Sequence, residues 1–173
     1  HDGMSSQPVW SPDGKRVIYK VINAAAKPIV RYYARAWDES DSATAVPGAD
    51  GAEAVEYPGP AGKYMAYVRG DSRVTENPRT NSDIYIAPID SPMVARPFAA
   101  TGLRERLPRF SPDGKWLVYT GHDLPQSGNV PNALLYARAV PGAGGAVTQV
   151  SLQTGTQPLW SRGSSYGLLN QVE

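Results

Sequence analysis

Leu107–Tyr119 reads LPRFSPDGKWLVY, and one hundred residues earlier Gln7–Tyr19 reads QPVWSPDGKRVIY. The shared core is an aromatic residue, then Ser-Pro-Asp-Gly-Lys, then a short apolar run. Pro presets φ at the first corner of a turn, Asp can accept hydrogen bonds from the backbone that follows, and Gly supplies a left-handed position. The run after the turn is β-branched and aromatic, as in a buried strand. The phrase therefore predicts two strands joined by a tight turn.

Two further stretches are weaker copies of this phrase. Val55–Tyr67 reads VEYPGPAGKYMAY and keeps the aromatic residue, a Pro/Gly turn, the Lys and the closing Tyr, whereas Gln157–Ser161 reads QPLWS and then loses the pattern. The aromatic markers of the four copies are separated by 47, 53 and 50 residues; they are Trp10, Tyr57, Phe110 and Trp160. Repeats of about 40–50 residues with four strands each are typical of β-propellers.

Each unit has room for two more strands after the phrase. Third strands are predicted from composition at residues 29–37, 83–89 and 133–140. More polar fourth strands are predicted at residues 43–46, 93–95 and 146–150. No stretch has a sustained helical period, and 16 Pro with 17 Gly would interrupt one. The sequence predicts an all-β fold.

The phrase resembles the PD40, or WD40-like, repeat of TolB-type β-propellers. The repeat in that family reads approximately Pro-x-Trp-Ser-Pro-Asp-Gly-Lys before an apolar strand, and residues 8–15 and 108–115 follow it closely. The resemblance implies blades that are four-stranded antiparallel sheets. It also implies an extracytoplasmic or periplasmic location. Such repeats occur in periplasmic binding proteins, peptidase accessory domains and extracellular kinase modules, so the resemblance implies a fold more strongly than a function.

The repeats divide residues 1–173 into one propeller domain with an incomplete last unit. Blade boundaries are predicted near residues 5–50, 51–101 and 102–152, with a partial fourth blade at 153–173. Because a stack of three blades would expose two apolar faces, we expect a half-propeller that forms a homodimer and closes as a six-bladed ring. The alternative is a truncated propeller fragment without a selected function. Both interpretations predict a hairpin at residues 156–169 with non-local or inter-chain contacts.

Composition excludes several classes of protein. The chain has 173 residues, a net charge of +1 and 41% hydrophobic residues, which suits one domain with its own core. Its charges are interspersed, so neither nucleic acid nor a membrane is expected as a partner. It has no Cys, which excludes disulfides and thiolate metal ligands and leaves the redox compartment open.

The two histidines are each followed by an aspartate, as His1-Asp2 and His122-Asp123. In a propeller blade, the loop before the first strand and the loop after the second strand lie on the same rim. In a two-fold dimer, blade 3 of one copy would abut blade 1 of the other and bring His122 near His1. Imidazoles with carboxylates suit a divalent metal, zinc first and calcium second. His122 and Asp123 would then be the catalytic residues of a metal-activated water.

Three polar residues of the longest loop, Arg73, Glu76 and Arg79, are predicted at that same rim. Arg104 and Glu105 precede the third unit there as well. Polar loops on a rigid scaffold often bind ligands, so these five residues are candidates for contact with a substrate or partner, and Arg104 for an anionic or phosphoryl group. A solvated loop is the simpler interpretation.

Two functions follow from these residues. The first is a metal-dependent hydrolase of esters, lactones or phosphotriesters, with a small-molecule substrate. Propeller hydrolases of the paraoxonase and diisopropyl-fluorophosphatase type offer an analogy of fold only, because none of their motifs occurs here. The alternative is a non-catalytic, TolB-like propeller module that binds a protein or peptide. Whether the chain is an enzyme is left open by the sequence.

Overall fold

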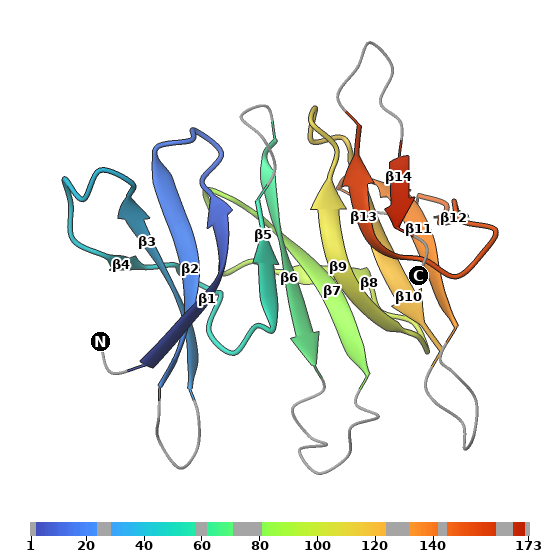
Figure 1. Cartoon of the computed structure of the whole chain (residues 1–173), viewed down its shortest axis with the longest axis horizontal. Helices are drawn as coiled ribbons and strands as arrows, with labels where there is room; N and C mark the ends of the chain where they lie inside the picture. Colours follow the sequence, from blue (N-terminus) through green and yellow to red (C-terminus); the bar gives the residue numbers. More distant parts are fainter. Residues whose placement is uncertain are drawn as a thin grey trace.

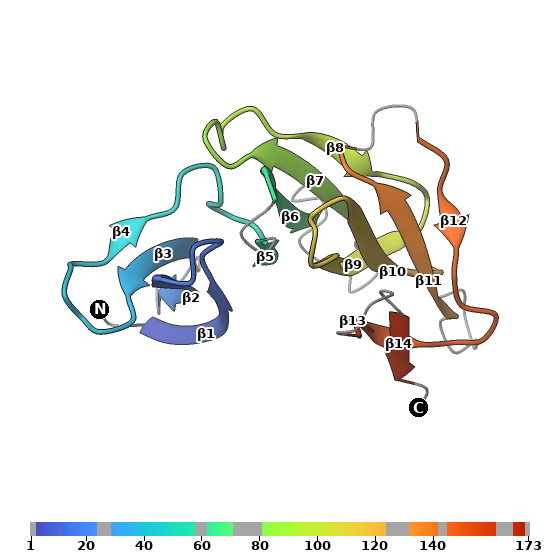
Figure 2. The same ribbon diagram turned by 90° about the horizontal axis from the view of Figure 1, so that it is seen from above.

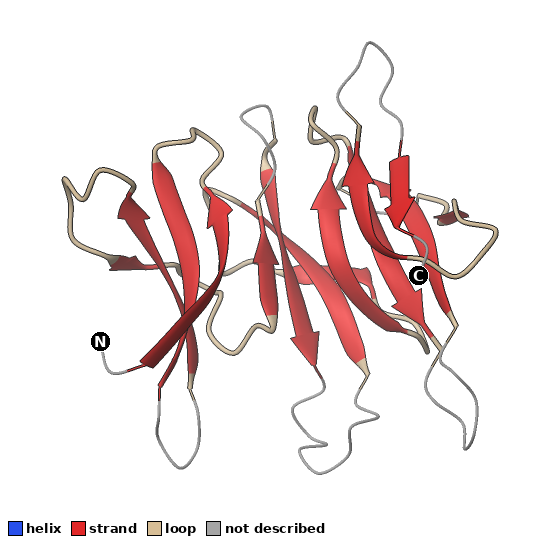
Figure 3. Cartoon of the chain, in the orientation of Figure 1, coloured by secondary structure: helices blue, strands red, loops and turns tan. Residues whose placement is uncertain are grey.

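The computed structural model describes residues 3–23, 29–57, 62–70, 81–123, 132–141, 145–161 and 168–171. Strands and turns make up this part of the chain, with no helix in it (Figure 3). Three four-stranded antiparallel sheets follow one another in sequence, and we call them blades 1, 2 and 3. Blade 1 contains β1 (Gly3–Trp10), β2 (Arg16–Asn23), β3 (Val30–Ala36) and β4 (Thr44–Ala45). Blade 2 contains β5 (Ala54–Glu56), β6 (Tyr64–Gly70), β7 (Ser82–Pro88) and β8 (Arg96–Ala99). Blade 3 contains β9 (Arg104–Phe110), β10 (Trp116–His122), β11 (Ala133–Ala139) and β12 (Thr148–Gln149).

The blades stand side by side in a row (Figure 1). Seen from above, the row curves into an arc with β1, β5 and β9 on its inner side and β4, β8 and β12 on its outer side (Figure 2). Every blade is a meander in which each strand pairs with the next along the chain. The expected all-β fold of propeller blades is confirmed.

The repeated phrase forms the same turn in blades 1 and 3. Ser11 Oγ donates to Asp13 Oδ1 at 2.6 Å, and the backbone N–H of Lys15 donates to the same oxygen at 3.0 Å. The corresponding bonds from Ser111 and Lys115 to Asp113 are 2.6 Å and 3.1 Å. The glycines of the two turns, Gly14 and Gly114, have φ of 67° and 69°, the left-handed conformation that the sequence predicts.

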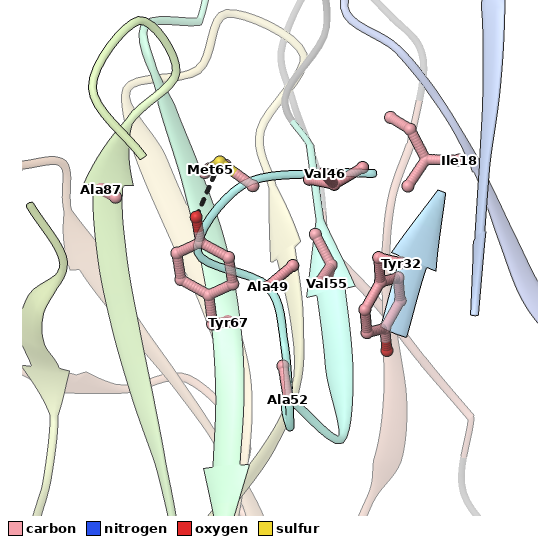
Figure 4. Close-up of a cluster of buried hydrophobic side chains, with 9 residues drawn as sticks. All are labelled: Ile18, Tyr32, Val46, Ala49, Ala52, Val55, Met65, Tyr67 and Ala87. Atoms are coloured by element: carbon pink, nitrogen blue, oxygen red, sulfur yellow. Dashed lines mark hydrogen bonds between the residues drawn. The ribbon is translucent and has the colours of Figure 1, made fainter. Parts of the chain in front are cut away.

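Apolar side chains fill the space between neighbouring blades. Between blades 1 and 2, Ile18 and Tyr32 of blade 1 pack in one cluster with Val55, Met65 and Tyr67 of blade 2 (Figure 4). Between blades 2 and 3, a second cluster combines residues of β6, β7 and β8 with residues of β9 and β10. Its members are Ala66, Val68, Ile84, Ile86, Phe98, Ala99, Phe110, Leu117 and Tyr119. The blades are therefore held together by sheet-on-sheet packing.

The predicted hairpin is present, as β13 (Thr156–Trp160) paired with β14 (Leu168–Gln171). It makes non-local contacts, because β13 packs on β9, β10 and β11 of blade 3. The indole Nε1 of Trp160 donates to the backbone oxygen of Arg109 at 3.1 Å. The hairpin thus packs on blade 3 of its own chain. The homodimer expected from the sequence stays a prediction.

The third strands lie where the sequence predicts them, but one fourth strand does not. Residues 93–95 are the end of a turn and the two residues after it, and they do not form a strand. The Val94 N–H donates to Ser91 O at 3.0 Å. Met93 and Val94 are exposed, and the strand that pairs with β7 is β8 instead. No helix within the described part of the chain is long and apolar enough to span a membrane.

Candidate functional site

Two ion pairs connect the inner strands of blades 2 and 3. Arg106 Nη2 lies 3.1 Å from Glu53 Oε2, and Arg109 Nη1 lies 3.0 Å from Glu56 Oε2. The partners of each pair are 53 residues apart, which is also the spacing between the markers Tyr57 and Phe110. They therefore occupy equivalent positions in successive repeats. Aligning the repeats would have revealed these pairs, and the sequence reasoning missed them.

The environment of Glu56 is unusual for a carboxylate. Only 15% of its side chain is exposed, and burial raises its pKa to about 7, although the Arg109 guanidinium opposes that rise. The residue that precedes β5, Glu53, accepts two more bonds through its backbone oxygen, from Lys20 Nζ at 3.2 Å and from the Tyr32 hydroxyl at 3.1 Å. The inner wall of the arc is thus a charged and hydrogen-bonded seam.

Basic groups gather where β9 begins and β10 ends, at the lower rim in Figure 1. In the register of these strands His122 lies opposite Arg104, and Thr120 lies opposite Arg106. The pKa of His122 is lowered, first by burial and then by the positive charges of Arg104 and Arg106. Arg104 Nε is buried and has no hydrogen-bond partner among the described residues. This corner has a positive field and a guanidinium with unused hydrogen-bonding capacity.

The predicted metal site is only half described, because His1 and Asp2 lie outside the described residues. Of the other half, His122 ends β10 and Asp123 follows it directly, with its N–H donating to Asn132 O at 3.0 Å. Within the described ranges, no three His, Cys, Asp or Glu residues are grouped so that they could hold a metal.

Glu105 differs from its predicted role as a contact for a substrate or partner. Its exposed fraction is 0%, and both the N–H (3.1 Å) and the hydroxyl of Thr101 donate to its Oε1. Its backbone oxygen accepts from Ser82 Oγ at 3.0 Å, and burial raises the pKa of its carboxyl. Glu105 therefore joins blade 3 to blade 2 and does not reach solvent. Sequence could not show this, because its neighbours Arg104 and Arg106 point to an exposed polar loop.

The remaining predicted contacts of a ligand, Arg73, Glu76 and Arg79, lie outside the described residues. A shallow pocket of about 730 Å³ lies at the opposite rim, between Pro12 of blade 1 and Tyr64 and Pro88 of blade 2. Its lining does not include Arg104, Arg106 or His122.

Solved structures of several proteins share this arrangement of blades. An isopeptidase with Astexin3-dC4 bound is 13% identical, with a TM-score of 0.58 over 87% of this chain and 30% of that chain. An oligogalacturonate lyase in complex with manganese is 15% identical, with a TM-score of 0.58 over 87% of this chain and 42% of that chain. A protein described as TolB from Agrobacterium tumefaciens is 12% identical, with a TM-score of 0.51 over 90% of this chain and 84% of that chain. The fold is that of a β-propeller.

At these identities the similarity shows the fold alone. The chain spans 30% of the isopeptidase and 42% of the lyase, less than half of either. No protein-family model matches the chain, and no curated protein matches it. Enzymes and TolB-type propellers both have this fold, so the function must be argued from the site.

Proposed function

We propose that this chain is a β-propeller module that binds a polypeptide at the lower rim of blade 3 and receives one of its carboxylates between Arg104, Arg106 and His122. The observation that carries the proposal is the gathering of these three groups around two neighbouring register pairs, His122–Arg104 and Thr120–Arg106, with no partner for Arg104 Nε among the described residues. Guanidinium groups form bidentate, charge-assisted bonds with carboxylates, and partial burial strengthens such bonds. Arg106 already binds one carboxylate oxygen, Glu53 Oε2, through Nη2 at 3.1 Å, and this contact supports a carboxylate as the ligand of the neighbouring Arg104.

The structural neighbours support a polypeptide as the ligand class. The isopeptidase is a peptidase by name and is seen with Astexin3-dC4 bound, and it contains this arrangement of blades within a longer chain. A module of a larger peptide-processing protein and a free-standing, TolB-like binding protein are both compatible with the proposal. The extracytoplasmic location implied by the repeat resemblance stays a prediction.

Binding of labelled peptides tests this function. An acidic peptide should bind more tightly than its Gln/Asn counterpart, and the affinity should increase as the pH falls and His122 becomes protonated. Arg104→Gln should weaken binding about 10-fold or more, as expected for loss of a charged hydrogen bond. Lys115→Gln, at the opposite rim, is the control and should bind like the wild type. Equal binding of the acidic and neutral peptides would refute the proposal.

A metal-dependent hydrolase of esters, lactones or phosphotriesters is the second candidate. Two observations favour it: the lyase neighbour is in complex with manganese, and the lowered pKa keeps His122 in the neutral form that metals bind. The positive field of Arg104 and Arg106 opposes it, because it repels a divalent cation at the same position. If His1 and Asp2 complete the set, zinc is the metal that we expect, with calcium second.

Metal content separates the two candidates. The hydrolase requires a stoichiometric metal in the purified protein, loss of ester hydrolysis with a chelator, and loss of both metal and turnover in His122→Ala. The binding module requires none of these. Protein free of metal after incubation with zinc would remove the hydrolase, while peptide binding would be unaffected.

A further inference from the structure

Glu53 is the residue at which the three blades are joined on the inner wall. It directly precedes β5 of blade 2, and its N–H donates to Val68 O of β6 at 2.7 Å. Its backbone oxygen accepts bonds from Lys20 Nζ and the Tyr32 hydroxyl of blade 1. Its carboxylate binds Arg106 of blade 3. Blades 1 and 2 therefore hold the backbone of Glu53, and blade 3 holds its side chain.

Both carboxylate oxygens of Glu53 have a defined place. Oε2 lies 3.1 Å from Arg106 Nη2. Oε1 lies beside Gly70, the last residue of β6, so closely that a Cβ at Gly70 would be only 2.7 Å from it. The glycine thus leaves room for the carboxylate at this end of the strand, next to the guanidinium that it binds.

The carboxylate of Glu53 acts on the cations around it. The pKa of Lys20 is lowered by burial; the carboxylate of Glu53 opposes that shift, and the guanidinium of Arg106 adds to it. Arg106 also acts on His122, where its charge adds to the effects of burial and of Arg104. One negative charge therefore lies among the positive charges that surround the proposed ligand site.

We infer that Glu53 makes the ligand site at Arg104, Arg106 and His122 selective for a carboxylate over a phosphate group. This inference rests on the proposed function, because it concerns the ligand of the same site. Glu53 already uses a donor of Arg106 and offsets part of the positive charge of Lys20 and Arg106. The site that remains suits an anion with a single negative charge.

The selectivity follows from the charge and the oxygens of the two ligands. A carboxylate carries one negative charge, whereas a phosphorylated serine carries about −1.5 to −2 near neutral pH. The repulsion by Glu53 increases in proportion to the charge of the ligand, so it costs the phosphate more. Because 32% of the Glu53 side chain and 40% of the Arg106 side chain are exposed, a ligand at this corner approaches both charges. A phosphate also has three oxygens to satisfy, and Glu53 competes with it for Arg106.

Peptide binding to the full chain tests this selectivity. One labelled peptide is prepared with Glu, phosphoserine or Gln at a single position, and its affinity is measured by fluorescence anisotropy at about pH 7.5, where the phosphate is close to doubly charged. The wild type should bind the Glu peptide at least as tightly as the phosphoserine peptide. In Glu53→Gln the ratio of phosphoserine to Glu affinity should rise about 10-fold, since the lost repulsion is about twice as large for the phosphate.

Two further variants separate the charge of Glu53 from its packing. Glu53→Asp keeps a negative charge at this corner and should keep the ratio of the wild type. Glu39→Gln is the matched control, because Glu39 is also paired with an arginine, Arg35 Nη2 at 3.5 Å, but lies after β3 in blade 1. It should bind all three peptides like the wild type. Circular dichroism should show native folding in each variant.

The peptides distinguish a failure of this inference from a failure of the proposed function. If the Glu peptide binds the wild type more tightly than the Gln peptide, the carboxylate site stands. The inference would then be overturned by an equal ratio in the wild type and Glu53→Gln, by a wild type that prefers the phosphoserine peptide, or by the same rise in Glu39→Gln. Equal binding of the Glu and Gln peptides to the wild type would refute the proposed function and this inference with it.

Discussion

Blades 1 and 3 share a thirteen-residue phrase and differ in what surrounds it. Their Ser-Pro-Asp-Gly turns have the same hydrogen bonds, and their cross-strand tyrosine pairs, Tyr19–Tyr33 and Tyr119–Tyr136, have the same register and are both stacked, with centroids 6.2 Å and 5.8 Å apart. Yet the aromatic residue before the turn is 57% exposed in blade 1 and 7% exposed in blade 3. The phrase determines local structure, whereas the neighbouring blade determines how much each residue contributes to stability.

The comparison predicts its largest effect at the aromatic marker. Phe110→Ala should lower the free energy of unfolding by about 3–5 kcal/mol, because it leaves a cavity between blades 2 and 3. Trp10→Ala should change it by less than about 0.5 kcal/mol, as for an exposed residue. Both are measured by urea denaturation. Similar losses at the two positions would mean that Trp10 is as well covered as Phe110.

A second difference separates the seams between blades. Val9 makes an apolar contact between blades 1 and 2, whereas its equivalents Glu56 and Arg109 form an ion pair between blades 2 and 3. The folded-state pKa of Glu56 is raised from 4.5 to about 7, so the folded protein holds this proton over a range in which the unfolded chain has released it. Stability from this group is therefore full below about pH 4.5 and is lost as the pH rises through about 7.

Glu56→Gln should remove this pH dependence of the free energy of unfolding. In the wild type we expect that free energy to fall by about 1–3 kcal/mol between about pH 4.5 and about pH 7. The measurement is the free energy of unfolding as a function of pH. Glu39→Gln is the control, because Glu39 is 76% exposed in blade 1 and should leave the slope as in the wild type. A Glu56→Gln profile parallel to that of the wild type would show that the ion pair is not buried.

The smallest predicted difference is in the repeated turn. Ser111 is 1% exposed and its hydroxyl accepts from Trp116 N–H at 3.0 Å, while the corresponding Ser11 is partly exposed. Ser111→Ala should cost about 1–2 kcal/mol, because it removes a buried hydroxyl and leaves the partly buried Trp116 N–H without this partner, and Ser11→Ala about 0.5 kcal/mol. Thermal unfolding of the two variants gives the comparison. A larger cost at Ser11 would contradict the assignment of blade 3 as the better-covered repeat.

The sequence predicted the parts of the fold that local chemistry controls. The turns, the first three strands of each blade and the tail hairpin follow from Pro, Gly and strand-forming residues placed at a fixed period. The prediction of a strand at residues 93–95 is wrong. Pairing with β7 determines where the edge strand lies, and the apolar residues Met93 and Val94 do not take part in that pairing.

The candidate site was less predictable, since it depends on contacts between repeats. Arg104 and His122 were identified from their shared rim, and their register pairing supports that placement. The burial of Glu105 and the Glu56–Arg109 pair arise from the packing of blade 3 on blade 2. The types of these residues alone do not predict that packing. The metal site and the loop at residues 71–80 stay predictions.

The central claim is that blade 1 presents the aromatic face that blades 2 and 3 bury. Hydroxyl-radical footprinting with mass spectrometry measures it residue by residue. Trp10 should be oxidised rapidly and Tyr19 at an intermediate rate, while Tyr67, Phe110 and Tyr119 should be protected. Protection of Trp10 equal to that of Phe110, or oxidation of Tyr119 as fast as that of Tyr19, would contradict the account.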